Sequence, residues 1–299
     1  MSEKCTLCPR NCGADRSSGV GYCHAPSELT VARAALHRFE EPVISGNNGS
    51  GTIFFCGCNL GCVYCQNRAV SRGFDREKTA AKIISEEDLA RIMLRLRDEG
   101  AHNINLVTPT HYADRIGNVL GRIKNELGIP VVYNCGGYES VGTLKNLEGL
   151  IDIYMPDFKY FSSELSEKYS SAPDYAERAS AALAEMYRQT GEFSLGDDGL
   201  MKKGILLRHL VLPGGRRDSS DVLKLVSETV DPGKILISIM RQYTPDFAPE
   251  EMKELRRRIT SFEYDFVISE SEKYGFVGFS QDKESAQTSY TPDFKLKTF

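Results

Sequence analysis

Six short runs of apolar residues recur along the chain and set its expected architecture. Most are nearly continuous rather than alternating, which is the pattern of strands that are buried on both faces of a sheet. The runs occupy residues 51–55, 103–108, 130–134, 151–158, 205–213 and 234–240. We expect one strand from each run.

Helical patterns fall between these runs. The clearest begins at Ser85, where Asp88 stands three residues on, as in a capping box. Apolar residues then recur at helical spacing until Gly100, and further helices are expected near residues 113–127, 140–149, 174–190, 219–230 and 249–262. Strands that alternate with helices predict an α/β protein with a parallel sheet and right-handed crossovers. Six repeats favour a partial barrel over an eightfold one, and an open doubly wound sheet is the alternative.

Composition and charge exclude several classes of function. The 299 residues are 41% hydrophobic and 26% charged, with a net charge of −4. We expect no nucleic-acid partner, because such proteins usually carry a basic domain or stripe. We also expect no membrane association, since no apolar run reaches the roughly 20 residues of a membrane span. The N-terminus, MSEKCTLCPRNC, lacks the apolar stretch of a signal peptide, so a cytoplasmic location is expected.

Polar and glycine-rich residues follow the predicted strands. Because the carboxyl ends of parallel strands meet at one edge of a sheet or barrel, we expect these residues to surround one site. They include TPTH after the second strand, NCGG after the third, DFK after the fourth and Arg208 in the fifth. A buried arginine is costly unless it is paired, so Arg208 is expected to have a partner. Its neighbour His209 would point to the opposite face and is expected to be structural.

Nine cysteines are the strongest chemical signal, and eight of them lie within the first 65 residues. In a reducing compartment such clusters indicate metal binding or catalysis rather than disulfides. Cys58, Cys62 and Cys65 form C-x3-C-x2-C directly after the first strand. Four interpretations are open: a zinc site with Cys56 as fourth ligand, an iron–sulfur cluster with one open iron, a Cys62–Cys65 redox pair, or structural thiols. An open coordination site on a metal is what catalysis uses.

A second group, with C-x2-C-x3-C-x10-C spacing, makes a complete set of four thiolates: Cys5, Cys8, Cys12 and Cys23. Four cysteines suit zinc and an iron–sulfur cluster equally, so the metal stays undecided. We therefore divide the chain into an N-terminal four-cysteine metal-binding segment (residues 1–47), a β/α-repeat domain (48–265) and a C-terminal tail (266–299).

The sequence CNLGCVYC, residues 58–65, resembles the signature of the radical SAM superfamily. In that superfamily three cysteines hold a [4Fe–4S] cluster after the first strand of a partial (β/α)6 barrel, and S-adenosylmethionine (SAM) chelates the open iron. The resemblance implies that Cys58, Cys62 and Cys65 are the catalytic cluster ligands of such a barrel. One electron from the cluster would cleave SAM to methionine and a 5′-deoxyadenosyl radical that abstracts hydrogen. Tyr64, the aromatic residue before the last cysteine, would lie beside the adenine.

Longer stretches are similar to the group of proteins related to pyruvate formate-lyase activating enzyme. That similarity implies that Asp157 and Lys159 approach the SAM carboxylate and that Arg208 contacts the cofactor. Gly136 would let the backbone approach the ribose. Asn134 falls where some of these enzymes bind a monovalent cation. The matching stretches are CTLCPRNCGADR, EEPVISGNNGSGTIFFCGCNLGCVYCQN, NINLVTPTHY, YNCGGYES, DIYMPDFKY and LLRHLVLPGG.

One motif of that group is absent. Its glycine-glycine-glutamate sequence, which binds the SAM amino group, is replaced by TPTH, so Thr108, Thr110 or backbone carbonyls would accept those hydrogen bonds. His111 is expected to contact cofactor or substrate, or to be an ordinary loop histidine. The implied partners are SAM, an electron donor such as flavodoxin or ferredoxin, and a glycyl-radical enzyme, a peptide or a small molecule as substrate. The alternatives are an iron–sulfur electron carrier or metal scaffold that does not cleave SAM, and a zinc-stabilised binding module.

Overall fold

The computed structural model describes residues 4–72, 79–281 and 294 of the chain. The strands are β1 (Leu29–His37), β2 (Ser50–Phe55), β3 (Lys82–Ile84), β4 (Ile104–Val107), β5 (Val131–Cys135), β6 (Ile153–Pro156), β7 (Ser194–Leu195), β8 (Met201–Leu210), β9 (Leu236–Met240) and β10 (Val277–Ser280). The α-helices are α1 (Pro42–Ser45), α2 (Arg68–Ser71), α3 (Glu86–Asp98), α4 (Ala113–Leu127), α5 (Val141–Lys145), α6 (Ser163–Ser170), α7 (Tyr175–Thr190), α8 (Arg216–Thr229) and α9 (Ser261–Lys273).

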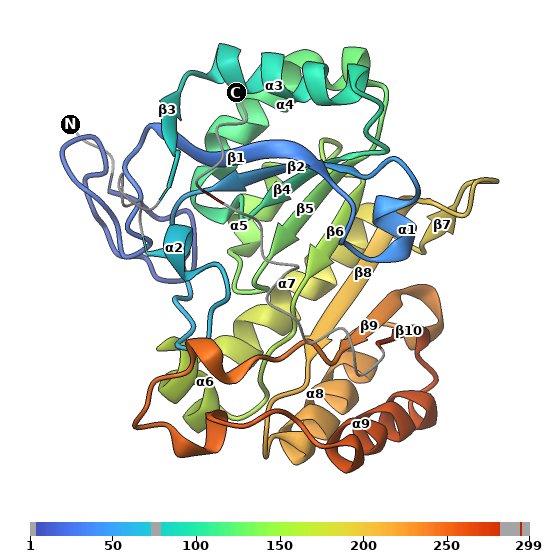
Figure 1. Ribbon diagram of the computed structural model, residues 1–299. Coiled ribbons are helices and arrows are strands. Elements are labelled where there is room, and N and C mark those ends of the chain that lie inside the picture. Colours follow the sequence, from blue (N-terminus) through green and yellow to red (C-terminus); the bar gives the residue numbers. More distant parts are fainter. Residues whose placement is uncertain (1–3, 73–78, 282–293, 295–299) are drawn as a thin grey trace.

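One mostly parallel sheet forms the centre of the molecule (Figure 1). Its strands run in the order β10-β9-β8-β6-β5-β4-β2-β1-β3, and β7 pairs with β8 outside this path. Every neighbouring pair from β2 to β10 is parallel, whereas β1 pairs antiparallel with both β2 and β3. The fold is therefore α/β, and the carboxyl ends of the parallel strands lie at one end of the sheet.

All six predicted strands are present, as β2, β4, β5, β6, β8 and β9. Continuous apolar runs identified them because these strands are buried on both faces; every residue of β2, β5, β6 and β9 is buried. The sequence did not reveal β1, β3, β7 or β10. The segment LTVARAALH of β1 is rich in alanine, which disfavours strands, and its pairing with β2 overrides that tendency.

Two of the longer helices begin at a capping box. Ser85 caps α3, where both hydrogen bonds of the expected capping box with Asp88 are formed. The helix expected at residues 249–262 is wrong, because that region contains only a 3₁₀ turn at Lys253–Leu255 before α9. A second capping box, between Thr260 and Glu263, sets the start of α9.

One expected domain boundary falls inside a helix, and the other lies between α1 and β2. The boundary after residue 265 lies within α9, whose Val267 is fully buried, and β10 beyond it pairs with β9. Residues 266–280 therefore belong to the body of the protein rather than to a tail. Of the rest, residues 282–293 and 295–299 lie outside the described residues, and Phe294 packs against Phe54. At the other end β1, within the expected segment 1–47, is part of the sheet.

The N-terminal loops lie beside α2 and the loop that precedes it, on the left in Figure 1. The described residues 4–28 contain no helix or strand. In the described part of the chain, no helix combines the length and the apolar character that crossing a membrane requires.

Candidate active site

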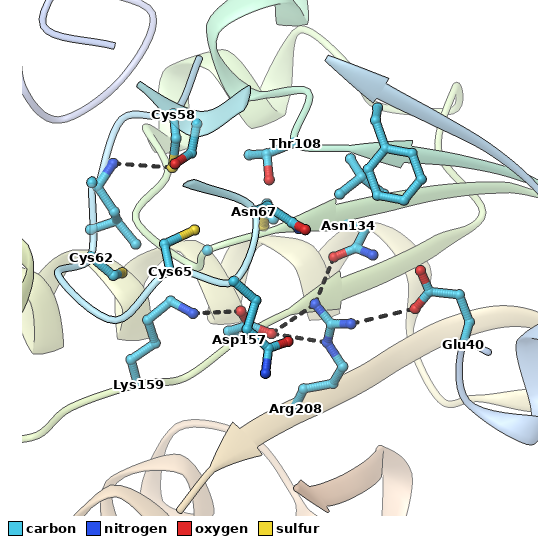
Figure 2. A pocket seen from close by; sticks show the side chains of 18 of the residues that line it. Glu40, Cys58, Cys62, Cys65, Asn67, Thr108, Asn134, Asp157, Lys159 and Arg208 are labelled. Carbon is cyan, nitrogen blue, oxygen red and sulfur yellow. Dashed lines mark hydrogen bonds and ion pairs between the residues drawn. The ribbon is translucent and has the colours of Figure 1, made fainter. Parts of the chain in front are cut away.

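A cavity of about 220 Å³ opens at the carboxyl ends of the parallel strands. One side is the loop after β2, which carries Cys58, Cys62 and Cys65, and Figure 2 shows these cysteines grouped on that loop. The opposite wall consists of residues from the ends of β4, β5, β6 and β8. Of the predicted site residues, the following line the cavity: Cys58, Cys62, Cys65, Thr108, Asn134, Gly136, Asp157, Lys159 and Arg208. The structure thus brings together residues that span 150 positions of sequence.

The three thiols of this loop are close neighbours. The Leu60 N–H donates to Cys58 Sγ over 3.4 Å, and the Ser170 hydroxyl donates to Cys62 Sγ over 3.0 Å. Burial raises the pKa of Cys65 to about 12, with a further contribution from Cys62 and Cys58. Burial also raises the pKa of Cys58. The thiolate forms that bind a metal are therefore disfavoured here without an added positive charge.

The donor set of these thiols is compatible with an iron–sulfur cluster. Among the described residues, no three His, Cys, Asp or Glu side chains are placed to hold one metal ion. In a cubane cluster each thiolate binds a different iron, so the ligands need not converge on one point. Three soft sulfur ligands on one loop, facing a shared cavity, fit the donor set of a [4Fe–4S] cluster with one open iron.

Cys56 does not join this group. Its side chain is 1% exposed and packs in an apolar cluster with Ala32, Phe54 and Val70, and burial raises its pKa to about 12. The zinc interpretation needed Cys56 as its fourth ligand, and the fold turns that thiol away from the cavity.

A network of buried charges forms the wall opposite the thiols. Asp157, just after β6, receives hydrogen bonds from Lys159 Nζ at 2.5 Å and from Arg208 Nε at 2.9 Å. Arg208 Nη2 donates to Asn134 Oδ1 over 2.7 Å, and Arg208 Nη1 lies 3.5 Å from Glu40 Oε2 (Figure 2). Burial alone would raise the pKa of Asp157, but Arg208 and Lys159 hold it below its ordinary value. The carboxylate is thus charged, and both cations stay protonated.

These two cations can bind an anionic ligand group. The side chains of Lys159 and Arg208 are only 14% and 15% exposed, and both line the cavity. A ligand carboxylate that entered would interact with them in a water-poor setting, where charge-assisted hydrogen bonds are strong. The expected partner of Arg208 is therefore present, and the Lys–Asp–Arg arrangement is largely buried rather than a surface ion pair.

Gly136 allows β5 to approach the three-cysteine loop. A Cβ atom at this position would lie 2.6 Å from Leu60 Cδ1, closer than carbon atoms can pack. Any side chain at residue 136 would therefore require the Leu60 side chain to move.

Three predicted cofactor-binding residues do not line the cavity: Tyr64, Thr110 and His111. Tyr64 is buried and its hydroxyl is 2.6 Å from that of Tyr160. His111 Nε2 is 2.7 Å from the Cys56 carbonyl, and burial lowers its pKa to about 3. In TPTH only Thr108 lines the cavity. Tyr64, on the three-cysteine loop, thus contacts Tyr160, and His111 contacts the backbone just before that loop.

Thr110 leads to a carboxyl group that the sequence did not single out. Its hydroxyl donates to Glu139 over 2.7 Å, and the Tyr133 hydroxyl donates to the other carboxyl oxygen over 3.0 Å. Burial raises the pKa of Glu139 to about 7, against the effect of these hydrogen bonds. The sequence pattern did not indicate Glu139, because this residue stands beyond the glycine pair rather than directly at the end of β5. Its side chain lies behind the cavity wall.

The four N-terminal cysteines lie apart from the cavity but near one another. A Cβ placed on Gly21 would be 3.5 Å from Cys12 Sγ and 3.4 Å from Cys23 Sγ. Burial raises the pKa of Cys8 to about 12, and the nearby Cys23 and Cys5 thiols contribute to the increase. The sequence grouping is thus reproduced in space, although these thiols are not arranged around one ion.

Sequence reasoning missed the part of the wall that comes from the end of β1. His37, Phe39 and Glu40 line the cavity at this side. Glu40 accepts a hydrogen bond from Asn105 Nδ2 over 3.1 Å besides its contact with Arg208, and burial raises its pKa. Glu40 and Glu41 directly precede the short helix α1, whose residues are mostly apolar. Two adjacent acidic residues beside an apolar segment could have indicated a buried charged group in the sequence.

Comparison with known proteins agrees with this architecture. Residues 52–191 match the sequence profile of the Radical SAM superfamily. The match begins in β2 and ends after α7, and it includes the three-cysteine loop, Asp157 and Lys159. Uncharacterized protein MJ0674 from Methanocaldococcus jannaschii is 27% identical to this chain over 277 residues, which is 91% of this chain and 75% of that protein.

Solved structures share the fold. A radical SAM methyltransferase from Sphaerobacter thermophilus matches with a TM-score of 0.53 and 12% identity over 78% of this chain and 66% of that chain. Methylornithine synthase (PylB) matches with a TM-score of 0.50 and 16% identity over 74% of this chain and 60% of its own. Streptococcus suis SuiB, bound to the precursor peptide SuiA, matches with a TM-score of 0.50 and 14% identity over 75% of this chain and 46% of that chain. The chain spans less than two thirds of each, and the likeness concerns the fold.

Proposed function

We propose that this protein is a radical SAM enzyme whose cavity holds a [4Fe–4S] cluster on Cys58, Cys62 and Cys65 with SAM beside it. The observation that carries the proposal is the placement of these three thiols opposite the paired cations Lys159 and Arg208, across one cavity. In this class the cluster supplies one electron that cleaves bound SAM, and the resulting 5′-deoxyadenosyl radical takes a hydrogen atom from substrate. The six parallel strands from β2 to β9 would be its partial (β/α)6 barrel.

The charged and the uncharged residues of the cavity would have different roles. The cations Lys159 and Arg208 would bind the carboxylate of SAM, and Asp157 holds both in position by its two hydrogen bonds. Asn134 orients the far side of the Arg208 guanidinium. Gly136 keeps the backbone close to the three-cysteine loop, so that the bound cofactor is enclosed. Tight enclosure excludes water, which protects a reactive species from side reactions.

The substrate is proposed to be a partner protein, in the manner of glycyl-radical activation, a peptide or a small molecule. The stretches that resemble the activating-enzyme group support the first of these, while the replacement of its glycine-glycine-glutamate motif by TPTH weighs against a simple equivalence. An electron donor such as flavodoxin or ferredoxin would reduce the cluster in the cytoplasm. The four N-terminal cysteines would bind a second metal, zinc or an iron–sulfur cluster.

An electron carrier or metal scaffold without SAM cleavage is the second candidate. The three thiols would suit such a protein as well. A carrier, however, has no use for a buried lysine and arginine at the strand ends, where they must be kept charged against burial.

The test is anaerobic reconstitution with iron and sulfide, followed by addition of dithionite and SAM. We expect 5′-deoxyadenosine from the wild-type protein and none from the Cys58→Ala, Cys62→Ala, Cys65→Ala variant. Cys56→Ala is the matched control, since this neighbouring thiol packs away from the cavity, and it should retain the cluster. About eight irons per chain would indicate a second cluster at the N-terminal cysteines, and about four irons with one zinc a zinc site. Iron loading without SAM cleavage under any reductant would favour the carrier.

A further inference from the structure

Arg10 extends from the N-terminal cysteine segment onto the loop that carries the three active-site thiols. It lies between Cys8 and Cys12 in sequence. Its Nε donates to the Asn59 carbonyl over 2.8 Å, and its Nη2 lies 3.4 Å from the Leu60 carbonyl. Both carbonyls belong to the short stretch between Cys58 and Cys62, so one guanidinium fixes the backbone at the centre of the three-cysteine loop.

The same guanidinium also holds the end of α6. Arg10 Nη2 donates to the Ser170 carbonyl over 2.8 Å, and Nη1 donates to the carbonyl of Ser171, whose φ of 50° is in the left-handed region. The Ser170 hydroxyl in turn donates to Cys62 Sγ over 3.0 Å. Arg10 thus reaches one of the three thiols through a single intermediate residue, besides holding the loop itself.

The contacts of Arg10 differ from those of an ordinary surface arginine. Among the described residues its hydrogen-bond acceptors are all backbone carbonyls, and its guanidinium lies 4.1 Å from the Tyr22 ring centre and 5.1 Å from that of Tyr138. None of the carboxylates in residues 4–72 and 79–281 forms an ion pair with it. A side chain with five donors in a fixed fork suits this task, because it can bind several carbonyls at once.

A second, independent contact joins the two cysteine groups through the backbone. The Cys58 N–H donates to the Cys23 carbonyl over 3.0 Å. Gly57, with a φ of 98°, makes this approach possible, because a Cβ at that position would lie 2.7 Å from the same carbonyl. The last N-terminal cysteine therefore contacts the start of the three-cysteine loop, while Arg10 holds its middle.

We propose that the N-terminal cysteine segment, residues 5–23, is a brace that sets the geometry of the three-cysteine loop, with Arg10 as the positioning residue that connects them. The inference rests on the proposed function, in which the loop holds the cluster and the N-terminal thiols hold a metal. Residues 4–28 have no helix or strand of their own, so their placement against the loop depends on contacts such as those of Arg10 and of the Cys23 carbonyl.

The experiment compares Arg10→Gln, Arg10→Lys and the control Arg91→Gln, all in the full-length reconstituted protein. Arg91 is an exposed arginine on α3 that pairs with Asp88. The readout is the electron paramagnetic resonance spectrum of the reduced cluster, with and without SAM, together with iron content. We expect Arg10→Gln to shift the spectrum and to weaken its change on SAM addition, Arg10→Lys to do so partly, and Arg91→Gln to match wild type. A wild-type spectrum for Arg10→Gln would overturn the proposal.

Hydrogen exchange measured on the same proteins without added iron keeps the proposal separate from the proposed function. Arg10→Gln should speed exchange at residues 58–62 and 170–172 by about tenfold, the effect of losing a charge-assisted hydrogen bond. This result would support the brace even if wild type bound no iron at the three thiols, which would sink the proposed function alone. Unchanged exchange would refute the brace. If Arg10→Gln does not fold, Cys12→Ser serves instead, since Cys12 is exposed, and it should give the same spectral shift.

Discussion

Lys159 and Arg208 share one carboxylate, and this pairing decides what the cavity can bind. Asp157 neutralises part of their charge, yet both cations face the same space as the three thiols. A ligand carboxylate would supply a second negative charge beside that of Asp157, so that two anions balance the two cations. Neither Lys159 nor Arg208 would have to move far. The affinity for SAM should therefore depend on each cation separately.

Lys159→Gln should weaken SAM binding by about tenfold or more. The variant keeps most of the length of the side chain and a polar end but removes a charge-assisted hydrogen bond, which contributes about 1.5–3 kcal/mol. The dissociation constant, measured by equilibrium dialysis on the reconstituted protein, checks this. Lys202→Gln is the matched control, because Lys202 pairs with Asp198 at the surface. Equal affinities for both variants would mean that Lys159 does not contact the cofactor.

His209 has the structural role that its position beside Arg208 predicts, and its protonation should limit stability in acid. Its Nδ1 is 2.7 Å from the Phe158 carbonyl and its Nε2 is 2.8 Å from the Ser219 hydroxyl. Burial lowers its pKa from 6.5 to about 4, so the unfolded chain binds a proton at a higher pH than the folded one. The free energy of unfolding should therefore fall as the pH decreases from about 6.5 to 4, by about 3 kcal/mol from this residue.

Denaturant unfolding at several pH values tests this contribution. His209→Gln retains one donor and one acceptor, and it should flatten the acid side of the stability profile. His24→Gln, which changes an exposed histidine, should leave the profile as it is in wild type. If the His209→Gln profile keeps the full wild-type slope between pH 4 and 6.5, the acid sensitivity arises from other groups.

At the scale of elements, the start of α9 depends on one capping box. Thr260 Oγ1 accepts from the Glu263 N–H, and the Glu263 carboxylate accepts from the Thr260 N–H over 2.8 Å. Glu263 also receives hydrogen bonds from Arg257 and from the Gly214 N–H, so the cap connects α9 to the loop after β8. Thr260→Ala should lower the free energy of unfolding by about 1 kcal/mol, while Thr260→Ser should retain most of it. Chemical denaturation measures both, and equal stability of all three proteins would contradict the role of the cap.

The sequence predicted strands where nearly every residue is buried. It predicted site residues at or just beyond the ends of parallel strands. Cys58, Asp157 and Arg208 could be placed near one another because parallel strands end at a common edge. Glu40 could not, since the antiparallel strand β1 delivers it from outside that pattern. Thr110 follows a strand but turns behind the cavity wall to Glu139, a direction that depends on the loop backbone rather than on spacing.

At the scale of the whole molecule, two cysteine groups lie on scaffolds of very different strength. The three-cysteine loop stands on a buried parallel sheet, whereas the described residues 4–28 have neither helix nor strand and rely on side-chain contacts such as those of Arg10 and Arg16. Arg16 is buried and donates to the carbonyls of Ala25, Pro26 and His111. Segments with few backbone hydrogen bonds open locally at low free-energy cost.

Removal of metal should therefore affect the N-terminal segment first. We expect a strong zinc and iron chelator to make the protein sensitive to trypsin after Arg10 or Arg16 while residues 86–273 remain intact. Trypsin cleaves a segment in proportion to the fraction of molecules in which that segment is locally unfolded. A metal on the four thiolates would keep this fraction low, and removal of the metal would raise it. Mass spectrometry of a short digestion, with and without chelator, locates the cuts. The Cys5→Ser, Cys12→Ser variant should be cut at these arginines without chelator. Cleavage unaffected by both chelator and variant would show that no metal orders this segment, and the four cysteines would then be ordinary thiols.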